Sequence, residues 1–174
     1  MSPIAHSGMA LLGWQVGATR KNIKTFCLFL LVASLSDFDF LLFFIFGRSR
    51  ISVHQYFTHN LFFIVLTVGL LSLFLPTARD RWSLVLVGLS HLVLDIIVID
   101  PARPIGIRPF FPFLKARINL GFFPYMNHGH FHDMFSRRNI GVFLLEAGVF
   151  VLPVLILSGK KIFRNFKSRD FWTL

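Results

Sequence analysis

The chain has 174 residues, of which 55% are hydrophobic and 23 are phenylalanine, and its formal net charge at pH 7 is +10. A mean hydropathy of +0.67 excludes an ordinary soluble domain and predicts one domain, residues 1–174, embedded in a lipid bilayer. Basic residues separate apolar segments and form no single stripe, which argues against a nucleic-acid partner and favours anionic membrane lipids.

The expected fold is an all-α integral membrane protein, a bundle of four to five transmembrane or membrane-embedded helices. The first apolar segment has 15 residues, about 22 Å as a helix, which suits a tilted or partly embedded helix. The loop between the third and fourth segments is so short that these two helices should be antiparallel neighbours. The five segments are residues 4–18, 25–47, 60–76, 82–99 and 140–158.

Two stretches have a different character. Residues 100–139 hold five prolines and six arginines or lysines but no apolar run long enough to cross, and are expected to form an interfacial or re-entrant loop region. Residues 159–174 are expected to form a basic tail.

The last apolar segment is interrupted by Glu146 and Pro153. A carboxylate at that depth needs a partner, and an arginine or a metal site would serve.

The fourth segment, residues 82–99, carries His91 and Asp95 in an otherwise apolar sequence. Residues four apart lie on one face of an α-helix. Because an ionisable group in hydrocarbon costs roughly 2.5–3.5 kcal/mol on insertion scales, the pair suggests a functional site. A hydrogen-bonded pair that merely locks two helices is the structural alternative.

Following the helices alternately across the bilayer brings the other intramembrane imidazoles and carboxylates to the same leaflet as this pair. A mixture of imidazole and carboxylate ligands suits Zn²⁺, Mn²⁺ or Fe²⁺. Zinc is expected first, with manganese or iron as alternatives, and the set is large enough for one or two ions. The expected metal ligands are His6, Asp37, Asp39, His54, His59, His91 and Asp95.

Several of these positions also have structural interpretations. His6 could lie at the interface, and His54 and His59 could anchor a span at the headgroups. Ser36 could cap a new helix with Asp39 as the acidic residue of a capping box, which would divide the second segment into two short helices.

A second histidine cluster lies in the interfacial region. His128, His130 and His132 have a spacing of two, so an extended chain would place the three rings on one face. An exposed, pH-sensitive loop and a second metal site are both compatible with this pattern.

Five short motifs occur in order and resemble those of the YdjM-like family of bacterial and archaeal inner-membrane proteins, described as LexA-regulated, membrane-bound, metal-dependent hydrolases. The resemblance covers roughly residues 5–113. The family's usual Pro-Asp-x-Asp stands here as Ser36-Asp37-Phe38-Asp39, and its His-Arg-Gly-x-Thr-His-Ser as His54-Gln-Tyr-Phe-Thr-His59-Asn60. The motifs are Ala5-His6-Ser7-Gly8, Leu35-Ser-Asp37-Phe-Asp39, His54-x4-His59, Leu89-Ser-His91-Leu-Val-Leu-Asp95 and Pro104-Ile-Gly106-x5-Pro112.

The resemblance implies a multi-pass inner-membrane hydrolase, with Asp39, His91 and Asp95 as the expected catalytic residues. A phosphoester of a lipid or lipid-linked molecule is the expected substrate, because arginines accompany the site. The loss of the motif arginine weakens a phosphate-binding role at that one position. The alternatives are a metal-binding or metal-transporting protein and a structural membrane protein. The arginines that accompany the predicted site are Arg48, Arg50, Arg103 and Arg108.

Overall fold

The structure is a computed structural model that describes residues 2–38, 58–99, 105–126 and 135–172. These residues are mainly helical, and they contain no strand, only two isolated bridges, Val98 with Phe123 and Ile107 with Ile118. The expectation of an all-α fold is therefore confirmed for the described part of the chain. Its helices are α1 (Pro3–Gly17), α2 (Ile23–Ser34), the 3-10 turn η1 (Leu35–Phe38), α5 (Leu61–Ser72), α6 (Ala78–Ile97), α7 (Arg137–Glu146), the π-helical turn η4 (Ala147–Val151), α8 (Leu152–Lys167) and α9 (Arg169–Trp172).

Polar caps set where the helices begin. Asn22 accepts a hydrogen bond from the backbone of α2, and Asn60 does the same for α5. Thr77 caps α6 by accepting from the Asp80 N–H at 3.1 Å. Because of this cap, α6 begins at Ala78, four residues before the apolar segment predicted from the sequence, and its first turn is charged.

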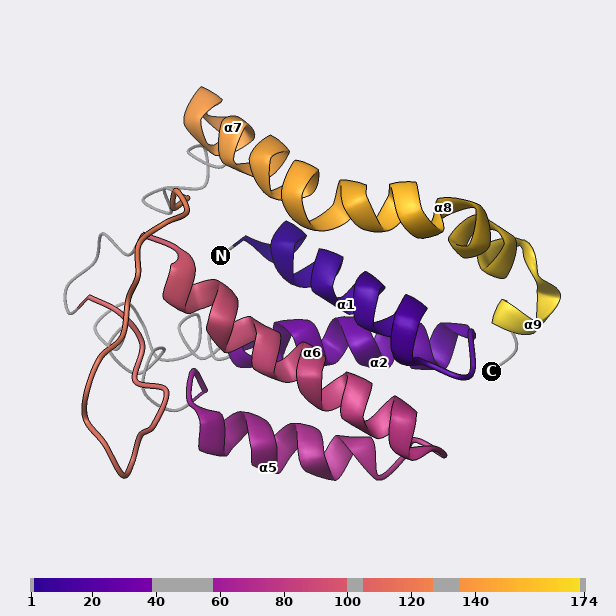
Figure 1. Cartoon of the computed structure of the whole chain (residues 1–174), viewed down its shortest axis with the longest axis horizontal. Helices are drawn as coiled ribbons and strands as arrows, with labels where there is room; N and C mark the ends of the chain where they lie inside the picture. Colours follow the sequence, from indigo (N-terminus) through magenta and orange to yellow (C-terminus); the bar gives the residue numbers. More distant parts are fainter. Residues whose placement is uncertain (1, 39–57, 100–104, 127–134, 173–174) are drawn as a thin grey trace.

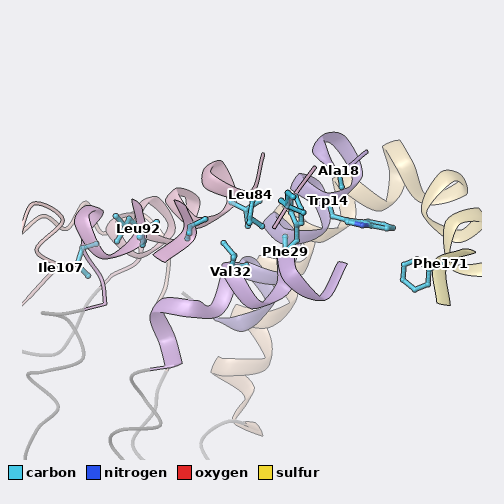
Figure 2. Close-up of a cluster of buried hydrophobic side chains, with 14 residues drawn as sticks. Trp14, Ala18, Phe29, Val32, Leu84, Leu92, Ile107 and Phe171 are labelled. Carbon is cyan, nitrogen blue, oxygen red and sulfur yellow. The ribbon is translucent and has the colours of Figure 1, made fainter. Parts of the chain in front are cut away.

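The helices α1, α2, α5 and α6 form a bundle in which α6 packs against α1, α2 and α5 (Figure 1). The continuous helix of α7, η4 and α8 lies along α1, on the side away from α5 (Figure 1). A hydrophobic core runs along the bundle from Ile107, beside the C-terminal end of α6, through Leu92, Leu84 and Trp14 to Phe171 in α9 (Figure 2).

The C-terminal segment is one helix of 31 residues, Arg137–Lys167, with a mean hydropathy of 2.6 in its most apolar window. Of the described helices, it is the one long and apolar enough to cross a membrane; α5 is apolar but shorter. The interruption expected at Glu146 and Pro153 is not a break. Pro153 has no backbone N–H and cannot donate to the carbonyl of Val149, four positions earlier. That carbonyl lies in the π-helical turn η4, so the helix widens there and continues through the proline.

The second predicted span changes character halfway along. The α-helix ends at Ser34, and Asp37 lies in the 3-10 turn η1 that follows. Residues 39–47, the second half of this span, lie outside the described residues. Asp37 therefore does not lie on a continuing α-helix, as an unbroken span over residues 25–47 would require.

Candidate metal centre

Five of the seven predicted ligands come together at one end of the bundle. The three imidazoles are buried, with His6 and His91 each 1% exposed and His59 3% exposed. Side-chain exposure rises to 10% at Asp95 and 37% at Asp37, so the cluster opens to the outside at Asp37. Asp39 and His54 lie outside the described residues, as do His128, His130 and His132.

Each ligand comes from a different part of the fold, apart from one pair. His6 lies in the second turn of α1, Asp37 in η1, and His59 immediately before Asn60, the cap of α5. His91 and Asp95 come from one face of α6, as their spacing of four predicts.

Four donor atoms lie at tetrahedral spacing. His91 Nε2 lies 3.1 Å from Asp95 Oδ2 and 3.6 Å from Asp37 Oδ1. His59 Nε2 lies 3.3 Å and 3.4 Å from the same two oxygens, and the two Nε2 atoms are 3.4 Å apart. Bonds of about 2.0–2.2 Å to a tetrahedral zinc ion imply ligand separations of about 3.3–3.6 Å. Five of the six edges of the tetrahedron thus match a single bound ion.

The hydrogen bond on the far side of His91 fixes how its ring faces the cluster. Nδ1 lies 2.7 Å from the carbonyl oxygen of Ala33. Since a carbonyl only accepts, Nδ1 carries the proton, and Nε2 is the ring atom that faces the carboxylates of Asp37 and Asp95; when the ring is neutral, Nε2 presents a lone pair there. Lone pairs that converge in this way favour a cation between them, and histidine ligands of metals are usually oriented by such a bond. The residues present therefore fit a divalent metal.

The segment 105–126 holds the ends of the helices that carry these ligands. The N–H groups of Leu120 and Phe122 donate to the carbonyls of Ile96 and Ile97 at 2.7 Å each, immediately after Asp95. The Leu61 N–H donates to Pro109 at 2.7 Å. The C-terminal end of α6 and the N-terminal end of α5 are thereby fixed beside the cluster.

Glu146 has a partner that sequence reasoning missed. Its side chain is fully buried and accepts hydrogen bonds from the backbone N–H of Ser2, at 3.2 Å, and from the Ser2 hydroxyl. The expected partner, an arginine or the metal site, was wrong for the described part of the chain. A carboxylate in an apolar segment signals that a partner exists, but Ser2 is 144 positions away, and no local pattern indicates it.

A comparison with protein families matches residues 1–163 to the YdjM inner membrane protein family. The chain belongs to this family. No curated protein and no solved structure matches it. In this YdjM family member the matched stretch includes all seven predicted ligands and most of the long C-terminal helix, so it extends well past the motifs that carry the resemblance.

The opposite end of the bundle of this YdjM protein is basic. Lys21 donates hydrogen bonds to the carbonyls of Trp14 and, at 2.8 Å, Gln15 at the C-terminal end of α1. Burial, together with the nearby charges of Lys161 and Arg79, lowers the pKa of Lys21 to about 8. Cationic side chains from three separate segments therefore gather at this end, while the His/Asp cluster that could hold a metal ion occupies the other.

Proposed function

We propose that this YdjM family member is a multi-pass inner-membrane hydrolase that cleaves a phosphoester of a lipid or lipid-linked substrate with the help of a divalent metal, zinc in the first instance and manganese or iron as alternatives. The metal is held by Asp37, His59, His91 and Asp95. The observation that carries the proposal is the set of five donor separations between 3.1 and 3.6 Å. Imidazole and carboxylate together are typical ligands of hydrolytic metal sites.

The long C-terminal helix supports a membrane-spanning arrangement. From Arg138 to Lys160 the rise is about 33 Å, close to the roughly 30 Å of a bilayer's hydrocarbon core, and basic residues lie at both ends. The shorter α5 presents large apolar side chains to the outside, among them Phe62, Leu66 and Leu70. A helix that is apolar on its exposed face as well as its packed face suits lipid.

The depth of the site supports a lipid or lipid-linked substrate. Along α6, His91 lies about 15 Å and Asp95 about 21 Å from Arg81, which marks the basic end. The cluster then lies at or beyond the middle of the hydrocarbon core and opens at Asp37. A headgroup or linker ester in the nearer leaflet is the group best able to reach it.

The chemistry divides between the metal and the chain. A divalent metal at this site supplies a Lewis acid that makes a water molecule nucleophilic near neutral pH and polarises a phosphoryl oxygen. His91 is held in the ligating tautomer by Ala33, and Asp95 lies one helical turn further along the same face. Asp39, outside the described residues, is the proposed proton acceptor. Arg108 adjoins Pro109, which binds the start of α5, and would offer its charge to a phosphate.

A metal carrier is the alternative, and the charge distribution disfavours it. A conducting path needs ligands toward both faces. In the described residues the His/Asp ligands gather at one end, while Lys21, Arg79 and Lys161 lie together at the other, where they repel a cation.

The test starts with the intact protein purified in detergent without chelator. Metal content is measured for wild type, His91→Ala, Asp95→Ala and, as a matched control on the same helix, Ser90→Ala. We expect bound metal in wild type and the control. In the two ligand variants the metal affinity should fall by more than roughly 10–100-fold, which is the loss expected when a residue that only hydrogen-bonds to a ligand is removed. A panel of lipid and soluble phosphoesters then separates enzyme from carrier by chelator-sensitive turnover. Metal-free wild type overturns the site, and bound metal without turnover on any substrate overturns the hydrolase.

A further inference from the structure

His6 does not belong to the tetrahedron of donor atoms, yet its ring is placed as if to bind. The imidazoles of His6 and His91 are stacked, with centroids 4.0 Å apart and planes inclined by 14°. Both ring nitrogens of His6 are buried and have no hydrogen-bond partner among the described residues. Desolvating two such polar atoms is costly unless a ligand compensates.

The carboxylates of the centre each offer a separate oxygen to His6. Its Nε2 lies 3.8 Å from Asp95 Oδ1 and 4.0 Å from Asp37 Oδ2. These are the oxygens opposite to the ones nearest His91, which are Asp95 Oδ2 and Asp37 Oδ1. At 3.8–4.0 Å, His6 is too far from either oxygen for a direct hydrogen bond, whereas an ion between them could contact all three atoms.

We infer that the centre binds two divalent cations, bridged by the carboxylates of Asp37 and Asp95. His59 and His91 ligate the first cation, and His6 ligates the second through Nε2. The inference rests on the metal centre of the proposed function and extends it. The centroids of the stacked His6 and His91 rings are 4.0 Å apart. Ions bound by two rings stacked in this way would have a similar separation, and the ions of two-metal sites are roughly 3.5–4 Å apart.

The ligand set also defines the class of the second ion and of the substrate. One imidazole and two carboxylate oxygens suit a first-row dication such as Zn²⁺, Mn²⁺ or Fe²⁺. Paired cations at this spacing stabilise both the entering and the leaving oxygen of an in-line displacement. That arrangement favours a phosphoester over a carboxylic ester or an amide.

The experiment titrates the metal-stripped protein in detergent with Mn²⁺. Bound metal is counted by mass spectrometry, and electron paramagnetic resonance reports whether the ions are coupled. We expect two equivalents with an exchange-coupled spectrum in wild type, and one equivalent with an isolated-ion spectrum in His6→Ala. The matched control is Gln15→Ala, a buried polar residue at the opposite end of α1, which should keep both ions.

The outcomes separate this inference from the proposed function. One equivalent in wild type, or two coupled ions retained in His6→Ala, overturns the second site and leaves the first intact. No bound metal in wild type overturns both. Because the coupled spectrum is read from wild type alone, a variant that fails to fold does not remove the test.

Discussion

The Nδ1–H group of His91 in α6 donates a hydrogen bond of 2.7 Å to the carbonyl oxygen of Ala33, near the end of α2. The last carbonyls of a helix lack partners within it, so the bond satisfies Ala33 and orients His91 in one step. It joins α6, which carries Asp95, to the end of α2, which leads directly into the turn η1 that carries Asp37. Nε2 is left to face both carboxylates.

Metal retention should depend on pH in a direction set by this arrangement. A cation can bind only when Nε2 of His59 and His91 is unprotonated and the carboxylates are ionised, so binding releases protons. Affinity should therefore fall as the pH is lowered, because protons compete with the cation for these two nitrogens. Equilibrium dialysis against a fixed free-metal concentration between pH 5 and pH 8 measures this. Affinity that is constant or rises on acidification would contradict imidazole ligation.

Gly8 lies where α1 passes closest to the long C-terminal helix. A Cβ atom at this position would lie 2.7 Å from the backbone oxygen of Phe150, which cannot move without shifting η4. Gly8→Ala should lower the free energy of unfolding by about 1–3 kcal/mol through overpacking. Thermal unfolding in detergent measures the change.

Gly69→Ala in α5 is the matched control for this substitution. In the part of the chain that the structure describes, no neighbouring atom lies within 4 Å of a Cβ atom added there. The variant should be neutral, or more stable by up to about 1 kcal/mol, because alanine favours a helix. Equal losses of stability in the two variants would show that the close contact at Gly8 is not the cause.

The spacing of polar residues in apolar segments carried much of the information about the fold and the centre. The spacing of four positions from His91 to Asp95 places both on one face, and alternate crossing places His6, Asp37 and His59 at the same end. Side-chain direction within the centre could not be read from the sequence. Which oxygen of Asp37 faces which imidazole depends on the 3-10 turn η1, which has no clear sequence signal here.

Helix ends were harder to predict than helices. The apolar pattern predicts a start of α6 at residue 82, four residues too late, because the first turn is charged, although Thr77 and Asp80 form a recognisable cap. The composition after Gly159 predicts a basic tail, but these residues continue α8 to Lys167. Lysine and arginine favour helices, so composition alone could not show where the helix ends.

Asp80, at the polar start of α6, should stabilise the fold in a pH-dependent way. Burial raises its pKa, but hydrogen bonds from the N–H and hydroxyl of Thr19, at 2.5 and 2.7 Å, and from Thr77 outweigh burial and hold the pKa below the ordinary value of 3.8. A lowered carboxyl pKa stabilises the folded state above the unfolded pKa, and this contribution is lost as the pH falls through the folded pKa.

Asp80→Asn should therefore cost about 1–3 kcal/mol of unfolding free energy at pH 7, because bonds to a charged acceptor are lost. Melting temperatures of wild type and variant should converge as the pH is lowered below about 4. A difference that stays constant over this range would show that the charge of Asp80 does not contribute.

Glu146 should control the N-terminal end of α1. It accepts two hydrogen bonds from Ser2, whose own hydroxyl caps the helix by accepting from the Ile4 N–H at 3.2 Å. Glu146→Ala leaves the Ser2 donors unpaired in a buried place, at a cost of about 1–3 kcal/mol, whereas Glu146→Gln keeps one acceptor and should cost less.

Since His6 lies one turn beyond Ser2, hydrogen exchange over residues 3–8 should rise in Glu146→Ala. The ion bound by His6 should also dissociate more readily than the ion bound by His91. Uniform loss of both ions, or exchange that rises equally throughout the bundle, would show that Glu146 supports the whole fold and not this end of α1.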